Sequence, residues 1–121
     1  MQRVLFVDDN RRVLAALHRQ LRRAPFDFMF ATGAGEAMAI VRQIRIDVVV
    51  SDFNMPDMTG PELFAHLRPL SPAADFVILS ARAEPDAEQL AQWDVVKYFA
   101  KPWNDEEIIN YIAELGHREA R

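Results

Sequence analysis

Residues 47–60 have the sequence Asp-Val-Val-Val-Ser-Asp-Phe-Asn-Met-Pro-Asp-Met-Thr-Gly. The apolar, β-branched part of this segment predicts a strand that is buried on both faces, at the centre of a parallel sheet. The strand ends at an aspartate, Asp52. Pro61 then lies just inside the start of an expected helix, which ends before Pro69. One buried strand therefore leads to one helix through a loop that begins with a carboxylate.

The same alternation of strand and helix extends on both sides of this segment. Further strands are expected at 4–7, 26–31, 76–79 and 95–100, and further helices at 11–23, 37–44, 85–93 and from 104 to near Gly116. No structure is expected after Gly116. Five strands alternating with five helices predict an α/β fold, a three-layer doubly wound (βα)5 sandwich with a parallel five-stranded sheet of order 2-1-3-4-5.

The composition favours one domain over residues 1–121 and excludes several classes of function. Half of the residues are hydrophobic, which suffices for one core, and no linker or second domain is visible. The net charge is −4 and the basic residues are scattered, which argues against direct nucleic-acid binding. The absence of cysteine excludes disulfides and thiolate zinc sites. The apolar run before Asp8 is too short for a signal peptide or a membrane span, so a cytoplasmic protein is expected.

Polar side chains follow four of the expected strands at the points where these strands end. Asp8 and Asp9 follow the first strand and Asp52 follows the third, while Ser80 and Lys101 end the fourth and fifth. In a doubly wound sheet, ligands bind outside the carboxyl ends of the strands, here between strands one and three. We therefore expect these five side chains to converge on one edge of the sheet.

The chemistry of such a cluster can be derived from its residue types. Crowded carboxylates repel one another unless a cation neutralises them. Mg²⁺ suits such a site because it binds carboxylate oxygens and completes its shell with water and phosphate oxygens. Mg²⁺, the ammonium of Lys101 and the hydroxyl of Ser80 could each contact one oxygen of a transferred phosphoryl group. One of the carboxylates would then be the nucleophile.

These residues resemble the receiver domains of two-component response regulators, which have a flavodoxin-like fold, over nearly the whole chain. The resemblance rests on four stretches: 8–9 (Asp-Asp), 52–60, 79–81 (Leu-Ser-Ala) and 98–103 (Tyr-Phe-Ala-Lys-Pro-Trp). Each stretch alone is a weak match, but together, in order and at strand ends, they are highly specific.

The resemblance implies a role for each residue of the site. Asp52 is expected to be the phosphoacceptor, and Mg²⁺ is expected to be bound directly by Asp9, Asp52 and the backbone carbonyl of Asn54. Asp8 is expected to act through a metal-bound water. The remaining implied roles are a hydroxyl switch at Ser80, an aromatic switch at Tyr98, a phosphate-binding Lys101 and a cis peptide bond at Pro102.

The resemblance also implies a signalling switch rather than an enzyme with turnover. A histidine kinase, a phosphotransfer protein or a small phosphodonor would phosphorylate Asp52. The surface of the fourth helix, fifth strand and fifth helix would then change, and it would control an effector domain or protein, or a phosphorylation-dependent homodimer. The same site is expected to assist its own dephosphorylation. Binding to a membrane is not expected.

Alternatives remain for the individual residues. The stretch 8–10 also suits a helix cap, Ser80 a turn, and Tyr98 simple packing. Trp103 could belong to a partner-binding face or to the start of the last helix. Arg82 is a large cation close to the site that could influence phosphoryl lifetime or contact the phosphate, and the sign of its effect is not predicted. The segment 92–94 (Gln-Trp-Asp) replaces the Gly-Ala that is usual in the family before strand five.

Three other functions compete with this interpretation. A receiver-like interaction module would work without phosphorylation, although the complete acidic set argues against it. An enzyme of the haloacid dehalogenase type would carry its nucleophile and general acid two positions apart after strand one, whereas adjacent aspartates stand there. A flavodoxin-like cofactor binder would need a first loop rich in glycine and hydroxyl groups, which is absent.

Overall fold

The computed structural model describes residues 2–100 and 103–119. Strands and helices alternate along the described chain. The elements are β1 (Arg3–Val7), α1 (Arg11–Gln20), the 3-10 helix η1 (Leu21–Arg23), β2 (Asp27–Ala31), α2 (Ala34–Gln43), β3 (Val48–Asp52), α3 (Gly60–Leu67), β4 (Asp75–Ser80), α4 (Ala87–Gln92), β5 (Lys97–Ala100) and α5 (Asp105–Glu119).

The five strands form one parallel sheet in the order β2-β1-β3-β4-β5, which confirms the expected fold. The register sets which residues end side by side. Val7 pairs with Ser51, so Asp8 and Asp52 both follow at the same edge. On the other side of β3, Asp52 pairs with Leu79. The carboxyl ends of the strands therefore lie together, as parallel pairing requires.

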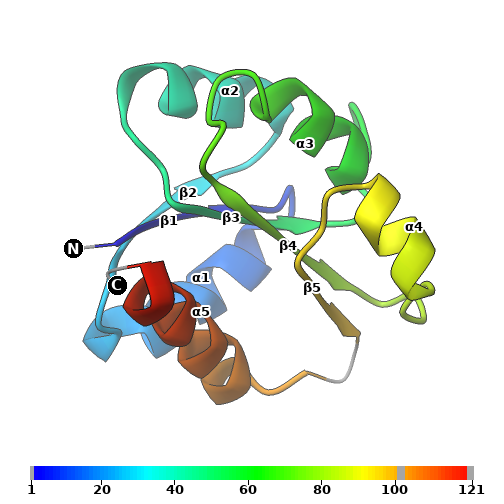
Figure 1. Ribbon diagram of the computed structural model, residues 1–121. Coiled ribbons are helices and arrows are strands. Elements are labelled where there is room, and N and C mark those ends of the chain that lie inside the picture. The colour runs from blue at the N-terminus through cyan, green and yellow to red at the C-terminus, as the bar shows by residue number, and fades with distance from the viewer. Residues whose placement is uncertain (1, 101–102, 120–121) are drawn as a thin grey trace.

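Two helical layers cover the sheet, with α2 and α3 on one face and α1 and α5 on the other (Figure 1). The alternation of side chains along each strand builds a separate core on each face. In β1, Leu5 and Val7 enter the first core, which lies under α2 and α3. Val4 and Phe6 enter the second core, which lies under α1 and α5. Leu90 and Trp93 pack against the first core, so α4 belongs to the α2–α3 layer, and these two residues are its anchors as expected.

The last helix is longer than the sequence predicts. Gly116 was expected to end this helix because glycine is common at helix C-termini. α5 instead continues to Glu119, so that prediction is wrong. A Cβ at Gly116 would overlap the side-chain amide of Gln2. The glycine therefore makes room for the start of the chain against α5, and it does so within a continuous helix.

The segment before β5 also differs from expectation, because α4 is shorter and β5 begins at Lys97 rather than at residue 95. Asp94 has φ 62°, in the left-handed region that Asp tolerates better than most residues. Its carboxylate accepts a hydrogen bond of 2.6 Å from Nε of Arg68. Arg68 also donates to the Ala74 carbonyl at 2.8 Å and lies over the Phe76 ring. This arginine ties the end of α3 to the turn before β5.

Gly60 is the place where α3 comes closest to the sheet. A Cβ at this position would lie 2.8 Å from the Asp52 carbonyl oxygen and 2.7 Å from Cδ1 of Ile78. Its N–H donates to the Phe53 carbonyl at 2.8 Å, so the backbone cannot withdraw without losing this bond. The absence of a side chain at Gly60 therefore allows the loop after Asp52 to close tightly.

We expect Gly60→Ala to lower the free energy of unfolding by about 1–3 kcal/mol, because the added methyl group must displace backbone or core atoms. Gly35→Ala is the matched control, since a Cβ there meets nothing within 4 Å and alanine favours helix by up to about 1 kcal/mol. Urea unfolding of both variants measures the difference. Equal stabilities would contradict the close approach at Gly60.

Candidate functional site

Three carboxylates meet at the carboxyl edge of the sheet, as their strand-end positions predict. Asp8 and Asp9 follow β1, and Asp52 ends β3. Each contributes one oxygen to a group in which all three oxygens lie within 4.8 Å of one another. Asp8 is largely buried, Asp52 is half-buried and Asp9 is exposed. The cluster is therefore open to solvent on one side and anchored in the fold on the other.

Backbone hydrogen bonds hold the loop after β1. The N–H of Asp8 donates to the Ala31 carbonyl at 3.1 Å, which extends the pairing of β1 with β2 by one residue. The N–H of Asn10 donates to Oδ1 of Asp8 at 2.8 Å. Asn10 in turn accepts the N–H of Arg12 at 2.9 Å and caps α1, as expected from the sequence. One carboxylate of the cluster is thus oriented by the first turn of a helix.

The loop after β3 is closed by hydrogen bonds at both ends. Phe53 donates its N–H to the Leu79 carbonyl at 3.2 Å, and its own carbonyl accepts from Gly60. Asn54 and Thr59 form an antiparallel bridge across the loop. The Ser51 hydroxyl is fully buried and donates to the Asp52 carbonyl at 2.8 Å. The backbone around Asp52 is consequently held from both sides.

The tip of this loop rests on another helix. Oδ2 of Asp57 accepts the N–H of Ala34, the first residue of α2, at 3.3 Å. A carboxylate at this position is favoured by the partial positive charge of a helix N-terminus. No local pattern in the chain predicts this contact, because it depends on the packing of α2 beside the loop.

The residues expected to act as switches share one neighbour, Arg82. Ser80 is 2% exposed, and its Oγ accepts the backbone N–H of Arg82 at 3.0 Å. Tyr98 is buried in the first core, and its hydroxyl donates to the backbone carbonyl of Arg82 at 3.1 Å. The residues after β4 are therefore connected both to the end of that strand and to β5.

The side chain of Arg82 lies on an aromatic ring beside the phosphoacceptor candidate. Its guanidinium carbon is 4.7 Å from the ring centroid of Phe53, the residue after Asp52. The same ring packs against Trp93, with centroids 5.4 Å apart. A cation–π contact of an exposed arginine contributes roughly 0.5–1 kcal/mol. The sequence singled out Arg82 for its charge, but it did not reveal this stack.

Two expected site residues, Lys101 and Pro102, lie outside the described residues. The phosphate-binding role of Lys101 and the cis bond before Pro102 therefore remain predictions. β5 is described as far as Ala100, which pairs with Ser80. Trp103 is half-buried against the α1–α5 core, and Asn104 accepts the N–H of Glu106 at 2.8 Å. This arrangement favours the interpretation of Trp103 as part of the start of a helix.

The donor set of the acidic cluster suits a divalent cation. Carboxylate oxygens are hard ligands of the kind that Mg²⁺ and Ca²⁺ prefer, and the three side chains already lie close enough to share one ion. The same closeness is unfavourable without a cation, because each carboxylate repels the other two. The cluster therefore fits Mg²⁺ binding.

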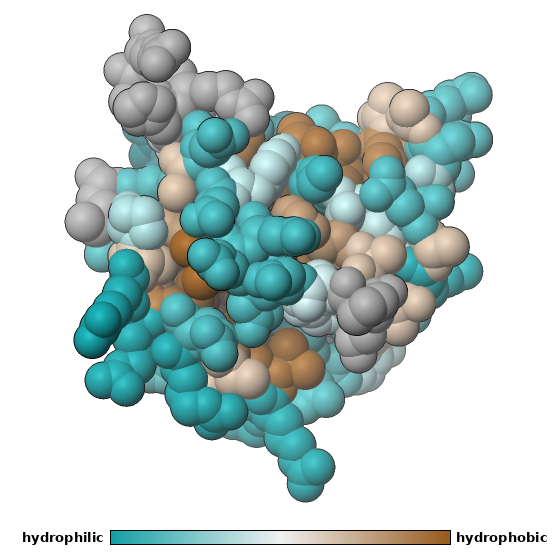
Figure 2. All heavy atoms as spheres, turned by 90° about the horizontal axis from the view of Figure 1, so that it is seen from below, coloured by the Kyte–Doolittle hydropathy of each residue, from teal (hydrophilic) through white to brown (hydrophobic). Residues whose placement is uncertain are grey.

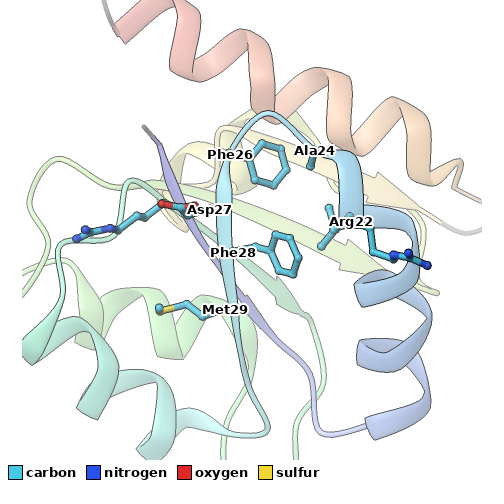
Figure 3. A pocket seen from close by; sticks show the side chains of 8 residues that line it. Arg22, Ala24, Phe26, Asp27, Phe28 and Met29 are labelled. Carbon is cyan, nitrogen blue, oxygen red and sulfur yellow. The ribbon is translucent and has the colours of Figure 1, made fainter.

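Two cavities lie away from this cluster. One of about 510 Å³ is beside the amino-terminal halves of β1 and β2, where Phe26 and Phe28 point to one side of β2 and Asp27 and Met29 to the other (Figure 3). The other, of about 730 Å³, lies between α3 and the end of α4 and includes Phe53 in its wall. Neither cavity is lined by a residue of the acidic cluster.

The face formed by α1 and α5 is largely hydrophilic, with small, separated apolar patches (Figure 2). Among the described residues, no helix combines the length and the apolar character that are needed to cross a bilayer.

Comparison with known proteins agrees with the fold. Residues 4–113 match the family model of the response regulator receiver domain. The transcriptional regulatory protein PrrA of Mycobacterium tuberculosis is 33% identical over 118 residues, which are 96% of this chain but only 50% of PrrA. The chain thus spans half the length of this curated relative.

Solved structures show the same architecture. The response regulator TrrA of Thermotoga maritima, in complex with Mg²⁺ and BeF, has a TM-score of 0.81 and 25% identity over 95% of this chain and 99% of TrrA. A response regulator of Burkholderia pseudomallei, with a phosphorylated aspartic acid and a calcium ion, has a TM-score of 0.79 and 26% identity over 99% of this chain and 74% of that protein. The chain described here belongs to the response regulator receiver domain family.

Proposed function

We propose that this chain is a phosphorylation-dependent signalling switch in which Asp52 accepts the phosphoryl group. The observation that carries the proposal is the group of three carboxylates within 4.8 Å, with Asp52 at the end of the central strand. The phosphorylated aspartic acid and the Mg²⁺–BeF complex of the two similar structures support it. Proteins of this family are generally signalling switches rather than enzymes with turnover.

In the proposed reaction, a carboxylate oxygen of Asp52 attacks the phosphorus of the donor. The bond from phosphorus to the donor breaks, either the P–N bond of a phosphohistidine or the P–O bond of a small acyl phosphate, and its electron pair leaves with the donor. Hydrolysis later adds water to the phosphorus, breaks the P–O bond to Asp52, and restores the carboxylate with release of inorganic phosphate. The site thereby assists both its phosphorylation and its dephosphorylation.

The other residues would position the reacting groups. Asp9, Asp52 and the backbone carbonyl of Asn54 would hold Mg²⁺, with Asp8 bound through water. When bound, the ion would neutralise the carboxylates and the phosphoryl oxygens. Lys101 and the hydroxyl of Ser80 would each contact a phosphoryl oxygen. The bridge between Asn54 and Thr59 supports this arrangement because it fixes the loop that carries the Asn54 carbonyl.

The signal would leave the site through the residues after β4. If the Ser80 hydroxyl turns toward the phosphoryl group, its hydrogen bond with the backbone N–H of Arg82 changes. The backbone carbonyl of Arg82 accepts a hydrogen bond from the hydroxyl of Tyr98, so a movement of Arg82 would also act on Tyr98. A shift there would reach β5 and the neighbouring surfaces of α4 and α5. Such a change would bias a two-state surface that a partner recognises.

Response regulators act between a histidine kinase and an effector, and we propose the same position for this chain. Its effector would be a further domain, a separate protein or a second copy. PrrA is a transcriptional regulatory protein, so the comparisons do not support the expected absence of nucleic-acid binding, which stays a prediction for these residues alone. A single receiver domain over 1–121 and a cytoplasmic location are parts of the same proposal.

The first prediction concerns the phosphoacceptor. Incubation with acetyl phosphate and Mg²⁺ should add the mass of one phosphoryl group to the wild type and to Asp57→Asn, but not to Asp52→Asn. Asp57 is the control because it is an exposed carboxylate of the same loop, and an amide oxygen can still accept the N–H of Ala34. Intact-mass spectrometry with peptide mapping measures the result.

A wild type that neither acetyl phosphate nor a cognate kinase phosphorylates, and that does not bind beryllofluoride, would contradict the proposal. The alternative would then be a receiver-like interaction module that works without phosphorylation.

The second prediction concerns the metal. Without Mg²⁺, Asp9→Asn should raise the free energy of unfolding by up to about 1 kcal/mol, because it removes one of three repelling charges. With Mg²⁺ at 100 times its Kd, the wild type should gain about 2.7 kcal/mol, and Asp9→Asn should lose most of this gain. Urea unfolding in EDTA and in Mg²⁺ measures both effects. Asp27→Asn, at the opposite edge of the sheet, should behave as the wild type, and an identical response of all three proteins would exclude the acidic cluster as the metal site.

A further inference from the structure

Arg82 is placed to exchange one partner for another. We propose that its guanidinium leaves the ring of Phe53 and binds the phosphoryl oxygens when Asp52 is phosphorylated, an inference that rests on the proposed function. Two features of the structure point to this exchange: the present contact of the Arg82 side chain and the anchoring of its backbone. The relative strength of the cation–π contact and of the contact with the phosphoryl group gives its direction.

The present contact leaves the charge of Arg82 available. The side chain is exposed, and its guanidinium carbon lies 4.7 Å from the Phe53 ring centroid. Within the described part of the chain, the two arginines that form salt bridges with carboxylates are Arg45 and Arg68. The guanidinium is therefore held by a ring face and not by a carboxylate.

The backbone of Arg82 is anchored beside the proposed phosphoryl group. Its N–H bonds the Ser80 hydroxyl at 3.0 Å, and Ser80 pairs with the last described residue of β5. The ring that holds the guanidinium belongs to the residue next to Asp52. Phe53 is one residue from Asp52, and Arg82 is two residues from Ser80, and both Asp52 and Ser80 would contact the phosphoryl group. We expect the partners to exchange through a change of the Arg82 side-chain rotamer, while its backbone stays in place.

The comparison of the two interactions gives the direction of the exchange. Phosphorylation replaces the single negative charge of the Asp52 carboxylate with a phosphoryl group that carries about −1.5 to −2 and three strong acceptor oxygens. The planar fork of arginine binds such oxygens through two parallel charge-assisted hydrogen bonds, which are stronger than an exposed cation–π contact. Phosphorylation also extends the side chain of Asp52 outward. The guanidinium should therefore prefer the ring before phosphorylation and the phosphoryl oxygens after it.

The exchange would also change the surroundings of Phe53. This ring packs against Trp93, and both residues line the cavity of about 730 Å³ between α3 and α4. Arg82 does not itself line that cavity, so loss of its guanidinium would act on the cavity through the position of the Phe53 ring. Arg82 would then be a phosphate-binding residue whose departure from Phe53 reports the state of Asp52 to the α3–α4 side of the domain.

The direct test follows the Nε–Hε signal of Arg82 by NMR, assigned by its absence in Arg82→Lys. Before activation this signal should lie upfield of the other arginine signals, because of the ring current of Phe53. Addition of beryllofluoride and Mg²⁺ to the full chain should remove the upfield shift. An unchanged Arg82 signal, while backbone signals around Asp52 show that beryllofluoride is bound, would overturn the exchange and leave the proposed function intact.

A double-mutant cycle separates the exchange from a general effect of charge. Arg82→Gln should weaken beryllofluoride binding about tenfold, the loss expected for a charge-assisted contact. Phe53→Leu should tighten binding about threefold, because it removes the competing ring. In the Arg82→Gln background the same Phe53→Leu change should have no effect. Arg42→Gln, an exposed arginine at the end of α2, is the control for net charge and should bind as the wild type.

The outcomes of the cycle are distinguishable. Equal effects of Phe53→Leu in both backgrounds would overturn the competition between ring and phosphoryl group. Equal losses in Arg82→Gln and Arg42→Gln would reduce the role of Arg82 to net charge and would also overturn it. No beryllofluoride binding by the wild type would instead refute the proposed function, and with it this inference.

Discussion

The mutual repulsion of Asp8, Asp9 and Asp52 is the constraint on which the rest of the site depends. Parallel pairing in register brings β1 and β3 to the same edge, so these carboxylates cannot separate without disturbing the centre of the sheet. The surrounding backbone is accordingly held by many hydrogen bonds, and Gly60 allows the loop after Asp52 to close against it. A rigid frame that keeps like charges together is suited to binding a cation and then an anionic phosphoryl group.

The residues after β4 provide the connection from this frame to the surface. Arg82 uses three separate groups: its N–H toward Ser80, its carbonyl toward Tyr98, and its guanidinium toward Phe53. A displacement at the phosphoryl site therefore has two routes outward, one to β5 and one to the wall of the α3–α4 cavity. Neither route requires the buried strands to move, which is consistent with the dense packing of both cores.

Most of the fold could be predicted because its elements carry strong local signals. The run of valines before Ser51 indicates a central strand, and the aspartates at the ends of the expected strands predict one shared edge. The predicted end of α5 and the predicted bounds of α4 and β5 were wrong because the local sequence signals there are ambiguous. Gly116 is a frequent helix terminator, yet here it accommodates Gln2, and α5 continues. Asp94 takes a backbone conformation that is more usual for glycine, which the sequence did not indicate.

The sequence by itself determined the fold class, the strand order that this class implies, and the convergence of the acidic residues, because these follow from periodicity and from the edge at which parallel strands end. Only the tertiary structure decided which side chains meet across the layers. Arg68 reaches Asp94 across 26 residues, and the rings of Phe53 and Trp93 meet below the guanidinium of Arg82. Such contacts depend on the packing of α3 and α4 on the sheet, and no short-range pattern in the chain encodes the distances between those elements.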